Sequence, residues 1–163
     1  METVNFEDIL SADRIELKAC AGSRKKALEL LGVQLSQTTE NVSPQDIVDS
    51  LCARERLGST GIGQGVAIPH ARSAAVDHTT GAIITLNDSI DFDAIDGQPV
   101  DFLFGLLVPE SADDEHLQVL ASIANVLNDK GLIGALRQCR DSQSFCSRIL
   151  TALDQEPTSK GAA

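Results

Sequence analysis

The sequence predicts an α/β protein in which one domain, over residues 1–154, holds a mixed β-sheet between helices on both faces. Its segments follow the order strand, helices, strands, helices, which is typical of layered α/β proteins. Residues 100–108 are apolar at nearly every position, and a strand that is apolar on both sides needs cover on both. No internal repeat or linker divides the 163 residues, and that length supports a core without disulfides or metals.

The individual elements follow from the spacing of apolar residues. Strands are expected where apolar and polar residues alternate or where a short run is wholly apolar, and helices where apolar residues recur at helical spacing. In chain order we expect a helical turn at 6–10, a strand at 14–19, helices at 24–35 and 44–57, strands at 66–68, 81–87 and 100–108, a helix opened by 109–116 that reaches 127, and helices at 130–139 and 142–153.

Capping residues mark the ends of these helices. Ser23, Ser43 and Asp141 stand where N-caps are expected, and Pro44 fits the first helical position. Gly58 is a natural residue to end the second helix. Two polar segments are expected to lack regular structure: residues 72–80, a loop in which His78 is exposed, and residues 155–163, a disordered C-terminal tail.

The stretch G-S-T-G-I-G-Q-G-V-A-I-P-H, at residues 58–70, carries the clearest chemical signal. Gly61, Gly63 and Gly65 permit positive φ and leave backbone N–H groups uncovered, as phosphate binding requires. Pro69 holds the residue before it extended, so His70 is delivered in a set direction. Neutral imidazole is a nitrogen nucleophile available near pH 7, because its pKa is about 6.5. We therefore expect His70 to be a phosphorylated nucleophile.

The same stretch also has a plainer interpretation. A glycine-rich segment before a strand is more often a connecting loop, and a single histidine at a strand end is more often a structural residue. The spacing matches neither G-x-x-x-x-G-K-[ST] nor G-x-G-x-x-G, which argues against ATP and NAD sites. Arg54 and Arg56 precede the stretch, and at most one of them readily turns toward it, since residues two apart on a helix do not share a face.

The amino-acid composition limits the classes of partner that the protein can bind. The chain has 24 acidic and 13 basic residues, a net charge of −11, which disfavours nucleic acid and anionic membranes and favours basic partner surfaces. Neither a signal peptide nor a long apolar stretch is present, so we expect a cytoplasmic protein without membrane insertion. The four cysteines form no C-x-x-C pair, and we expect reduced core thiols, most of them in amphipathic helices.

Three motifs in order resemble the IIA components of the fructose/mannitol class of the phosphoenolpyruvate phosphotransferase system. They are the stretch at 58–70, F-D-A-I-D-G-Q-P-V-D-F-L-F at 92–104, and L-L-V-P-E-S-A-D-D-E-H-L-Q-V-L at 106–120. The resemblance covers nearly the whole chain, which would form a type-2 EIIA domain, and is strongest with the nitrogen-related branch. The length supports that branch, because sugar-specific relatives are usually fused to further domains. Ala71 departs from the glycine that many relatives have.

The resemblance implies a phosphoryl relay. Phosphoenolpyruvate would phosphorylate an enzyme I, which passes the group to an HPr-like phosphocarrier (NPr in this branch), which passes it to this protein. The protein would regulate target proteins by its phosphorylation state, as a phosphotransferase-type carrier with no cofactor or metal rather than an enzyme that turns over a small molecule. The implied site comprises His70 as acceptor through Nε2, His116 for positioning or stabilisation, Arg54 for phosphate stabilisation, and Ser59, Thr60, Gly61, Gly63 and Gly65 for phosphate binding.

Three other interpretations remain open from the sequence. A sugar-specific IIA would pass its phosphate to a IIB domain for carbohydrate uptake. A binding module would contact its targets through the acidic surface regardless of phosphorylation. A metal site formed by His70, His78 and His116 is disfavoured, because no carboxylate or thiolate at ligand spacing completes it.

Overall fold

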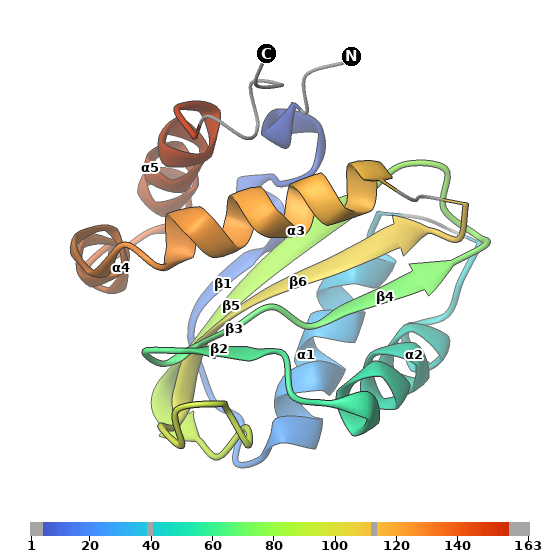
Figure 1. Cartoon of the computed structure of the whole chain (residues 1–163), viewed down its shortest axis with the longest axis horizontal. Helices are drawn as coiled ribbons and strands as arrows, with labels where there is room; N and C mark the ends of the chain where they lie inside the picture. Colours follow the sequence, from blue (N-terminus) through green and yellow to red (C-terminus); the bar gives the residue numbers. More distant parts are fainter. Residues whose placement is uncertain (1–4, 39–40, 112–113, 157–163) are drawn as a thin grey trace.

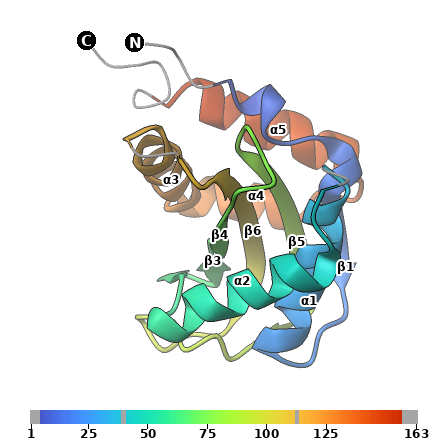
Figure 2. The same cartoon turned by 90° about the vertical axis from the view of Figure 1, so that its right-hand side faces the viewer.

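A six-stranded mixed sheet lies between two layers of helices, as the sequence predicts (Figures 1 and 2). The computed structural model describes residues 5–38, 41–111 and 114–156. In both views α1 and α2 cover one face of the sheet, and α3, α4 and α5 cover the other. The strand order is β1-β5-β6-β3-β2, and β4 also pairs with β6.

The N-terminal elements agree with their predictions, apart from a short helix at residues 12–14 that the sequence did not predict, and the caps of the two α-helices form as expected. They are η1 (Phe6–Asp8), η2 (Ala12–Arg14), β1 (Ile15–Ala19), α1 (Arg24–Ser36) and α2 (Pro44–Leu57). The Ser23 hydroxyl accepts a hydrogen bond from the N–H of Lys26 at 3.2 Å. The Ser43 hydroxyl accepts one from the N–H of Asp46 at 3.1 Å, so both predicted N-caps are confirmed.

The sheet contains two strands, at residues 61–63 and 70–73, that the sequence did not predict. The remaining strands are β2 (Gly61–Gly63), β3 (Val66–Ala67), β4 (His70–Ser73), β5 (Thr80–Ile90) and β6 (Val100–Pro109). The prediction of a loop over residues 72–80 is wrong at both ends, because Thr80 begins β5 and Arg72 and Ser73 complete β4. This strand pairs, among the described strands, with β6 alone, and such an edge position needs no apolar run.

The core has two halves, one on each face of the sheet. Phe102, Phe104 and Leu106 of β6 belong to a buried cluster shared with α3, α4 and α5. Leu103 and Leu107 belong to the cluster under α1 and α2. Alternate side chains of this one strand thus fill both halves, as its apolar run over residues 100–108 predicts.

The C-terminal helices are α3 (Asp114–Leu127), α4 (Lys130–Arg137) and α5 (Ser142–Asp154). Asp141 caps α5 by accepting from the N–H of Ser144 at 2.8 Å, as predicted. Within the described ranges no single helix is long and apolar enough to cross a membrane; Leu117–Leu127 and Lys130–Arg137 pass that test only together, with a bend of 79° between them. Of the predicted tail, residues 157–163 lie outside the described ranges.

The cysteines differ from the expectation of core thiols in helices. No disulfide joins them, and only Cys146, in α5, is buried. Cys52 lies partly buried in α2, whereas Cys139 follows the end of α4. Cys20 is exposed after β1, so the expectation that most cysteines lie in helices is wrong.

Candidate functional site

His70 begins β4 at the edge of the sheet. β3 runs parallel to β6 up to Ala67, and β4 resumes parallel pairing with the same strand, where His70 lies opposite Leu106. Between the two strands the carbonyl of Pro69 accepts a hydrogen bond from the N–H of Leu106 at 2.9 Å. The proline therefore separates two strands that share one partner, and the backbone of His70 is held by the sheet on one side.

A backbone contact places the proton on the neutral His70 ring. Its Nδ1 atom lies 2.9 Å from the carbonyl oxygen of Ile68. A carbonyl oxygen only accepts hydrogen bonds, so Nδ1 must carry the proton in this contact. In the neutral ring the lone pair is then on Nε2, which becomes the nucleophilic nitrogen.

The surroundings of His70 favour its neutral form. Burial lowers the pKa of His70 below its usual range, because the charged ring loses solvation. The hydrogen bond to Ile68 raises the pKa, and the positive charges of Arg54 and Arg72 lower it further. The net lowering keeps the ring uncharged at pH values where a free histidine is already protonated.

A pocket of about 440 Å³ opens beside His70, at the sheet edge where α2 lies against β4 (Figure 1). Its walls are Ser50, Ala53, Arg54 and Leu57 of α2 and His70, Ala71 and Arg72 of β4. The structure therefore brings Arg54 and His70 together in one hollow, and the roles that the resemblance implies for them stay predictions. Arg56 does not line this pocket.

Arg72 is a site residue that the sequence analysis missed. It lies two residues after His70 on the same strand, and residues i and i+2 of a strand point to the same face. The buried residue between them, Ala71, belongs to the cluster under α1 and α2. Recognition of residues 70–73 as a strand would have placed Arg72 beside His70.

Both arginines are anchored through a carbonyl oxygen. Nη1 of Arg54 donates to the carbonyl of Gly58 at 2.9 Å, and Nη1 of Arg72 donates to the carbonyl of Glu110 at 3.2 Å. A guanidinium has five N–H groups, so each arginine can bind an anion while it keeps its anchor. The pocket therefore combines a neutral imidazole with two cations suited to a phosphoryl group.

His116 is the third residue of α3, but its side chain lies outside the described part of the structure. Its approach to His70 stays a prediction. His78 lies in the exposed loop before β5, where its Nδ1 is 2.7 Å from a carboxylate oxygen of Asp77. Among the residues that the structure describes, no group of three or more His, Cys, Asp or Glu side chains could hold a metal ion.

The hydroxyl groups of Ser59 and Thr60 are engaged within the fold. The Ser59 hydroxyl donates to the carbonyl of Phe92 at 2.7 Å and accepts from the N–H of Gly61 at 3.0 Å. The hydroxyl of Thr60 donates to Glu55, and its N–H donates to the same carboxylate at 3.2 Å. Phosphate binding by Ser59 and Thr60 stays a prediction, and it would require these donors to change partners.

Glu55 is a second residue whose role the sequence did not indicate. Its carboxylate is buried, with 4% of the residue exposed, and it ties the last turn of α2 to the start of the glycine stretch. Burial raises the pKa of Glu55, while the hydrogen bonds from Thr60 and the charges of Arg24 and Arg54 lower it. Glu55 thereby holds the segment that follows α2, close to the pocket.

The three glycines contact a different part of the molecule from His70. A Cβ atom on Gly61 would meet Ala94, and one on Gly63 would meet Asp96. Gly65 has a φ of +84°, and a Cβ there would come within 2.6 Å of the Arg137 guanidinium. None of the three lines the pocket at His70. Their packing accounts for glycine at these positions, and phosphate binding by them stays a prediction.

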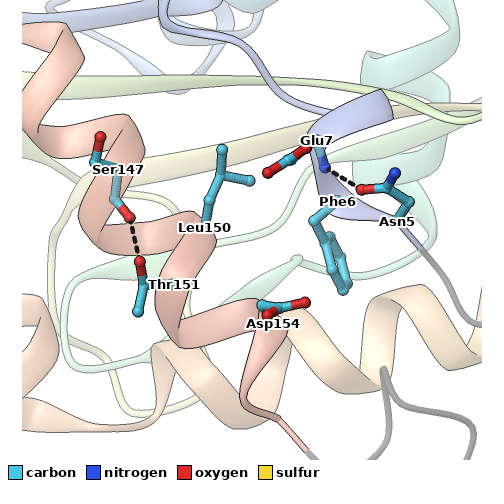
Figure 3. A pocket seen from close by; sticks show the side chains of 7 residues that line it. All are labelled: Asn5, Phe6, Glu7, Ser147, Leu150, Thr151 and Asp154. Carbon is cyan, nitrogen blue, oxygen red and sulfur yellow. Dashed lines mark hydrogen bonds between the residues drawn. The ribbon is translucent and has the colours of Figure 1, made fainter.

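A second hollow, of about 320 Å³, lies between η1 and α5 (Figure 3). Phe6 and Leu150 supply apolar surface, and Glu7 and Asp154 supply carboxylates. Among the residues that the structure describes, no histidine, lysine or arginine lines it, and carboxylates repel a phosphoryl group. The pocket at His70 is therefore the better candidate for phosphoryl chemistry.

Comparison with known proteins shows which family the chain belongs to. The family model described as "Phosphoenolpyruvate-dependent sugar phosphotransferase system, EIIA 2" matches residues 8–152. The chain belongs to this EIIA 2 family. An EIIA 2 relative named "Nitrogen regulatory protein", from Pseudomonas aeruginosa, is 39% identical over 142 residues, which cover 87% of this chain and 92% of the relative.

A solved EIIA structure supports the fold. The crystal structure of the nitrogen regulatory protein IIA-Ntr from Neisseria meningitidis superposes with a TM-score of 0.82 at 40% sequence identity, covering 90% of this chain and 97% of the other. This EIIA chain is therefore similar to nitrogen regulatory proteins in both sequence and structure, as the three motifs indicate.

One sugar-specific relative bears on the argument from length. A protein of Haloferax volcanii named "PTS system fructose-specific EIIA component" is 31% identical over 145 residues, which cover 88% of this chain and 94% of that protein. A sugar-specific EIIA protein can thus be as short as this chain. Length alone does not separate the two branches of the family.

Proposed function

We propose that this EIIA chain is a nitrogen-related phosphocarrier that accepts a phosphoryl group on Nε2 of His70 from the phosphohistidine of an HPr-like carrier. The hydrogen bond of 2.9 Å between Nδ1 of His70 and the carbonyl of Ile68 is the observation that carries the proposal. It assigns the lone pair to Nε2, and the lowered pKa keeps that lone pair available.

The proposed step exchanges one P–N bond for another. The Nε2 lone pair of His70 attacks phosphorus in line with the donor nitrogen, and the donor P–N bond breaks with its electron pair returning to the donor imidazole. The His70 ring gains positive charge as the new bond forms. Because Nδ1 keeps its proton and donates to Ile68, the carbonyl dipole stabilises that charge. Neither a cofactor nor a metal takes part.

Arg54 and Arg72 would hold the transferred group. A phosphoryl group carries about −1.5 to −2 charges, and an isolated one would be unfavourable on a chain with a net charge of −11. Two guanidinium groups at the mouth of one pocket offset that charge locally. His116 would add a further donor from the start of α3. The proposal locates the reaction in the cytoplasm and assigns regulation of target proteins to the two phosphorylation states.

A labelling experiment tests the acceptor. The chain is incubated with phosphoenolpyruvate, enzyme I and the HPr-like carrier, and incorporation of acid-labile phosphate is measured in wild type, His70→Ala and His78→Ala. We expect label in wild type and in His78→Ala, whose histidine lies in an exposed loop, and none in His70→Ala. Label that persists in His70→Ala would refute the assignment.

A sugar-specific role is the second candidate, favoured by the similarity to the fructose-specific protein of Haloferax volcanii. The phosphorylated chain would then pass its group to a IIB domain. Incubation of the phosphorylated chain with a fructose or mannitol IIB domain separates the two roles. Rapid transfer to IIB supports the sugar-specific role, and phosphate retained on His70 supports the regulatory one.

A further inference from the structure

Glu55 is a buried carboxylate that the proposed phosphoryl transfer does not use. It lies in the last turn of α2 and does not line the pocket at His70. Its ion-pair partner is Arg24 of α1, at 3.9 Å. Burying a carboxylate costs free energy, and an ion pair does not always repay that cost. Stability alone is therefore a weak reason for a glutamate at this position.

The Glu55 carboxylate binds one residue of the stretch after α2 through two contacts. It accepts hydrogen bonds from the N–H of Thr60, at 3.2 Å, and from the hydroxyl of Thr60. Thr60 is itself buried. Because one donor belongs to the backbone and the other to the side chain, Thr60 cannot turn while both bonds keep good geometry. Glu55 thus fixes the orientation of the backbone at Thr60.

Two further hydrogen bonds connect Thr60 to the ring of His70. The carbonyl of Thr60 accepts from the N–H of Ile68 at 3.0 Å. The carbonyl of Ile68 in turn accepts from Nδ1 of His70 at 2.9 Å. A shift of Thr60 would therefore move Ile68, and with it the oxygen that keeps the proton on Nδ1. Glu55 acts on the acceptor ring through these two residues without touching it.

Glu55 also acts on the arginine of the pocket. Gly58 lies two residues before Thr60, and its carbonyl accepts from Nη1 of Arg54 at 2.9 Å. The N–H of Gly58 donates to the backbone carbonyl of Glu55 at 3.1 Å. Residues 58–60 are therefore bound to Glu55 at both ends, through its backbone and through its side chain. The carbonyl that anchors Arg54 belongs to this short segment.

We infer that Glu55 is a positioning residue for phosphoryl transfer: by holding residues 58–60 it sets the direction of Nε2 of His70 and the place of the Arg54 guanidinium. The inference rests on the proposed function and adds a residue to the same site. Phosphoryl transfer depends mainly on positioning and on stabilisation of charge. A misplacement of about 1 Å can slow such a reaction about 100-fold, so a residue that holds both groups affects the rate without contacting phosphorus.

Substitutions at Glu55 test the inference through the rate. Glu55→Ala removes the side-chain acceptor of Thr60, and Glu55→Gln keeps one side-chain oxygen at the same distance from the backbone. Ile149→Val is the control, because it trims a buried side chain in the other half of the core. Phosphoramidate is a small phosphoryl donor that needs no docking surface, and its maximal rate of transfer is measured for each folded protein. We expect Glu55→Ala to slow transfer by about tenfold, Glu55→Gln to restore part of the rate, and Ile149→Val to leave it unchanged. Equal rates in Glu55→Ala and wild type would overturn the inference.

The tautomer of His70 is a second readout, which a purely structural role would not change. ¹⁵N NMR of the unphosphorylated protein at about pH 8, where the ring is neutral, measures the share of His70 rings with the proton on Nδ1. We expect that share to fall in Glu55→Ala and to stay unchanged in Ile149→Val. Thr60→Val, which removes the hydroxyl contact alone, should lower the share less and replaces Glu55→Ala if that variant does not fold.

The two readouts separate this inference from the proposed function. The tautomer is measured without any phosphoryl transfer, so a lowered share supports the action of Glu55 on the ring even if His70 is not the acceptor. An unchanged share in Glu55→Ala, or in Thr60→Val where it replaces that variant, would overturn the inference even if His70 is the acceptor. Failure of the proposed function appears elsewhere, as label that persists in His70→Ala.

Discussion

Nδ1 of His70 lies 2.9 Å from the carbonyl oxygen of Ile68, two residues earlier in the chain. Pro69 stands between them, and its own carbonyl is bound by the N–H of Leu106 in β6. The sheet therefore holds the backbone at Pro69, between the two residues whose contact sets the tautomer of the His70 ring. The backbone contact places the proton on Nδ1 and so leaves the lone pair of the neutral ring on Nε2.

The first prediction concerns the pH dependence of His70. Its pKa is lowered, first by burial and then by Arg54 and Arg72, so the ring should stay neutral below about pH 6.5, where a free histidine becomes charged. An NMR titration of the His70 ring should give a midpoint below about 6.5, the ordinary value for histidine. A midpoint above about 6.5 would contradict the burial argument.

The same shift predicts how stability changes with pH. The folded protein holds the His70 proton more weakly than the unfolded chain, so the unfolded chain binds more protons below about pH 6.5. The contribution of neutral His70 is therefore present above that pH and is lost as the pH falls. Urea unfolding at pH 7.5 and 5.5 should show a smaller loss of stability in His70→Gln than in wild type. An identical loss in both proteins would count against the shift.

The second prediction concerns Arg72. Arg72→Ala removes a cation that disfavours the charged ring, so the pKa of His70 should rise. It also removes a donor for the phosphoryl group, and acceptance from phosphoramidate should slow by about tenfold or more. Arg148→Ala removes an exposed arginine of α5 and should change neither quantity. An unmoved His70 pKa together with unchanged acceptance from phosphoramidate would show that Arg72 acts on neither the ring nor the phosphoryl group.

The third prediction concerns Glu55. Glu55→Ala leaves the N–H and hydroxyl of Thr60 without their acceptor in a buried place and should lower the free energy of unfolding by about 1–3 kcal/mol. Glu29→Ala is the control, because its ion pair with Lys26 is partly exposed and is worth less than about 1 kcal/mol. Equal effects in urea unfolding would show that Glu55 is not a structural anchor.

The fourth prediction separates two glycines. Gly65→Ala forces a side chain into positive φ and against Arg137, which also holds Asp101 at 2.7 Å, so stability should fall by about 1–2 kcal/mol or more. Gly134→Ala in α4 meets open space and should raise stability by about 0.5–1 kcal/mol. The two changes should move the melting temperature in opposite directions, and a rise for Gly65→Ala would contradict the assigned packing.

The parts of the fold that the sequence predicts correctly depend on residues that are close together in the chain. Ser23, Ser43 and Asp141 each cap the helix that follows them, because a side-chain oxygen satisfies the free N–H groups of a first turn wherever the helix lies. The apolar run over residues 100–108 correctly indicated a strand covered on both faces, since each of its side chains needs a buried environment.

The parts that could not be predicted depend on contacts between distant segments. β4 is polar and short, and it exists because β6 offers an edge to pair with. For this reason the sequence predicts a loop, and not a strand, at Arg72. The glycines at 61, 63 and 65 pack against Ala94, Asp96 and Arg137, which come from segments far along the chain. Spacing alone carries no information about such neighbours.

The position of the phosphoryl group on the ring tests the central claim most directly. The chain is phosphorylated by phosphoenolpyruvate, enzyme I and the HPr-like carrier, and long-range ¹H–¹⁵N NMR then identifies which histidine nitrogen is bonded to phosphorus. The account predicts phosphorus on Nε2 of His70, with the proton kept on Nδ1 beside Ile68. Phosphorus on Nδ1 of His70, or on any other side chain, would contradict it.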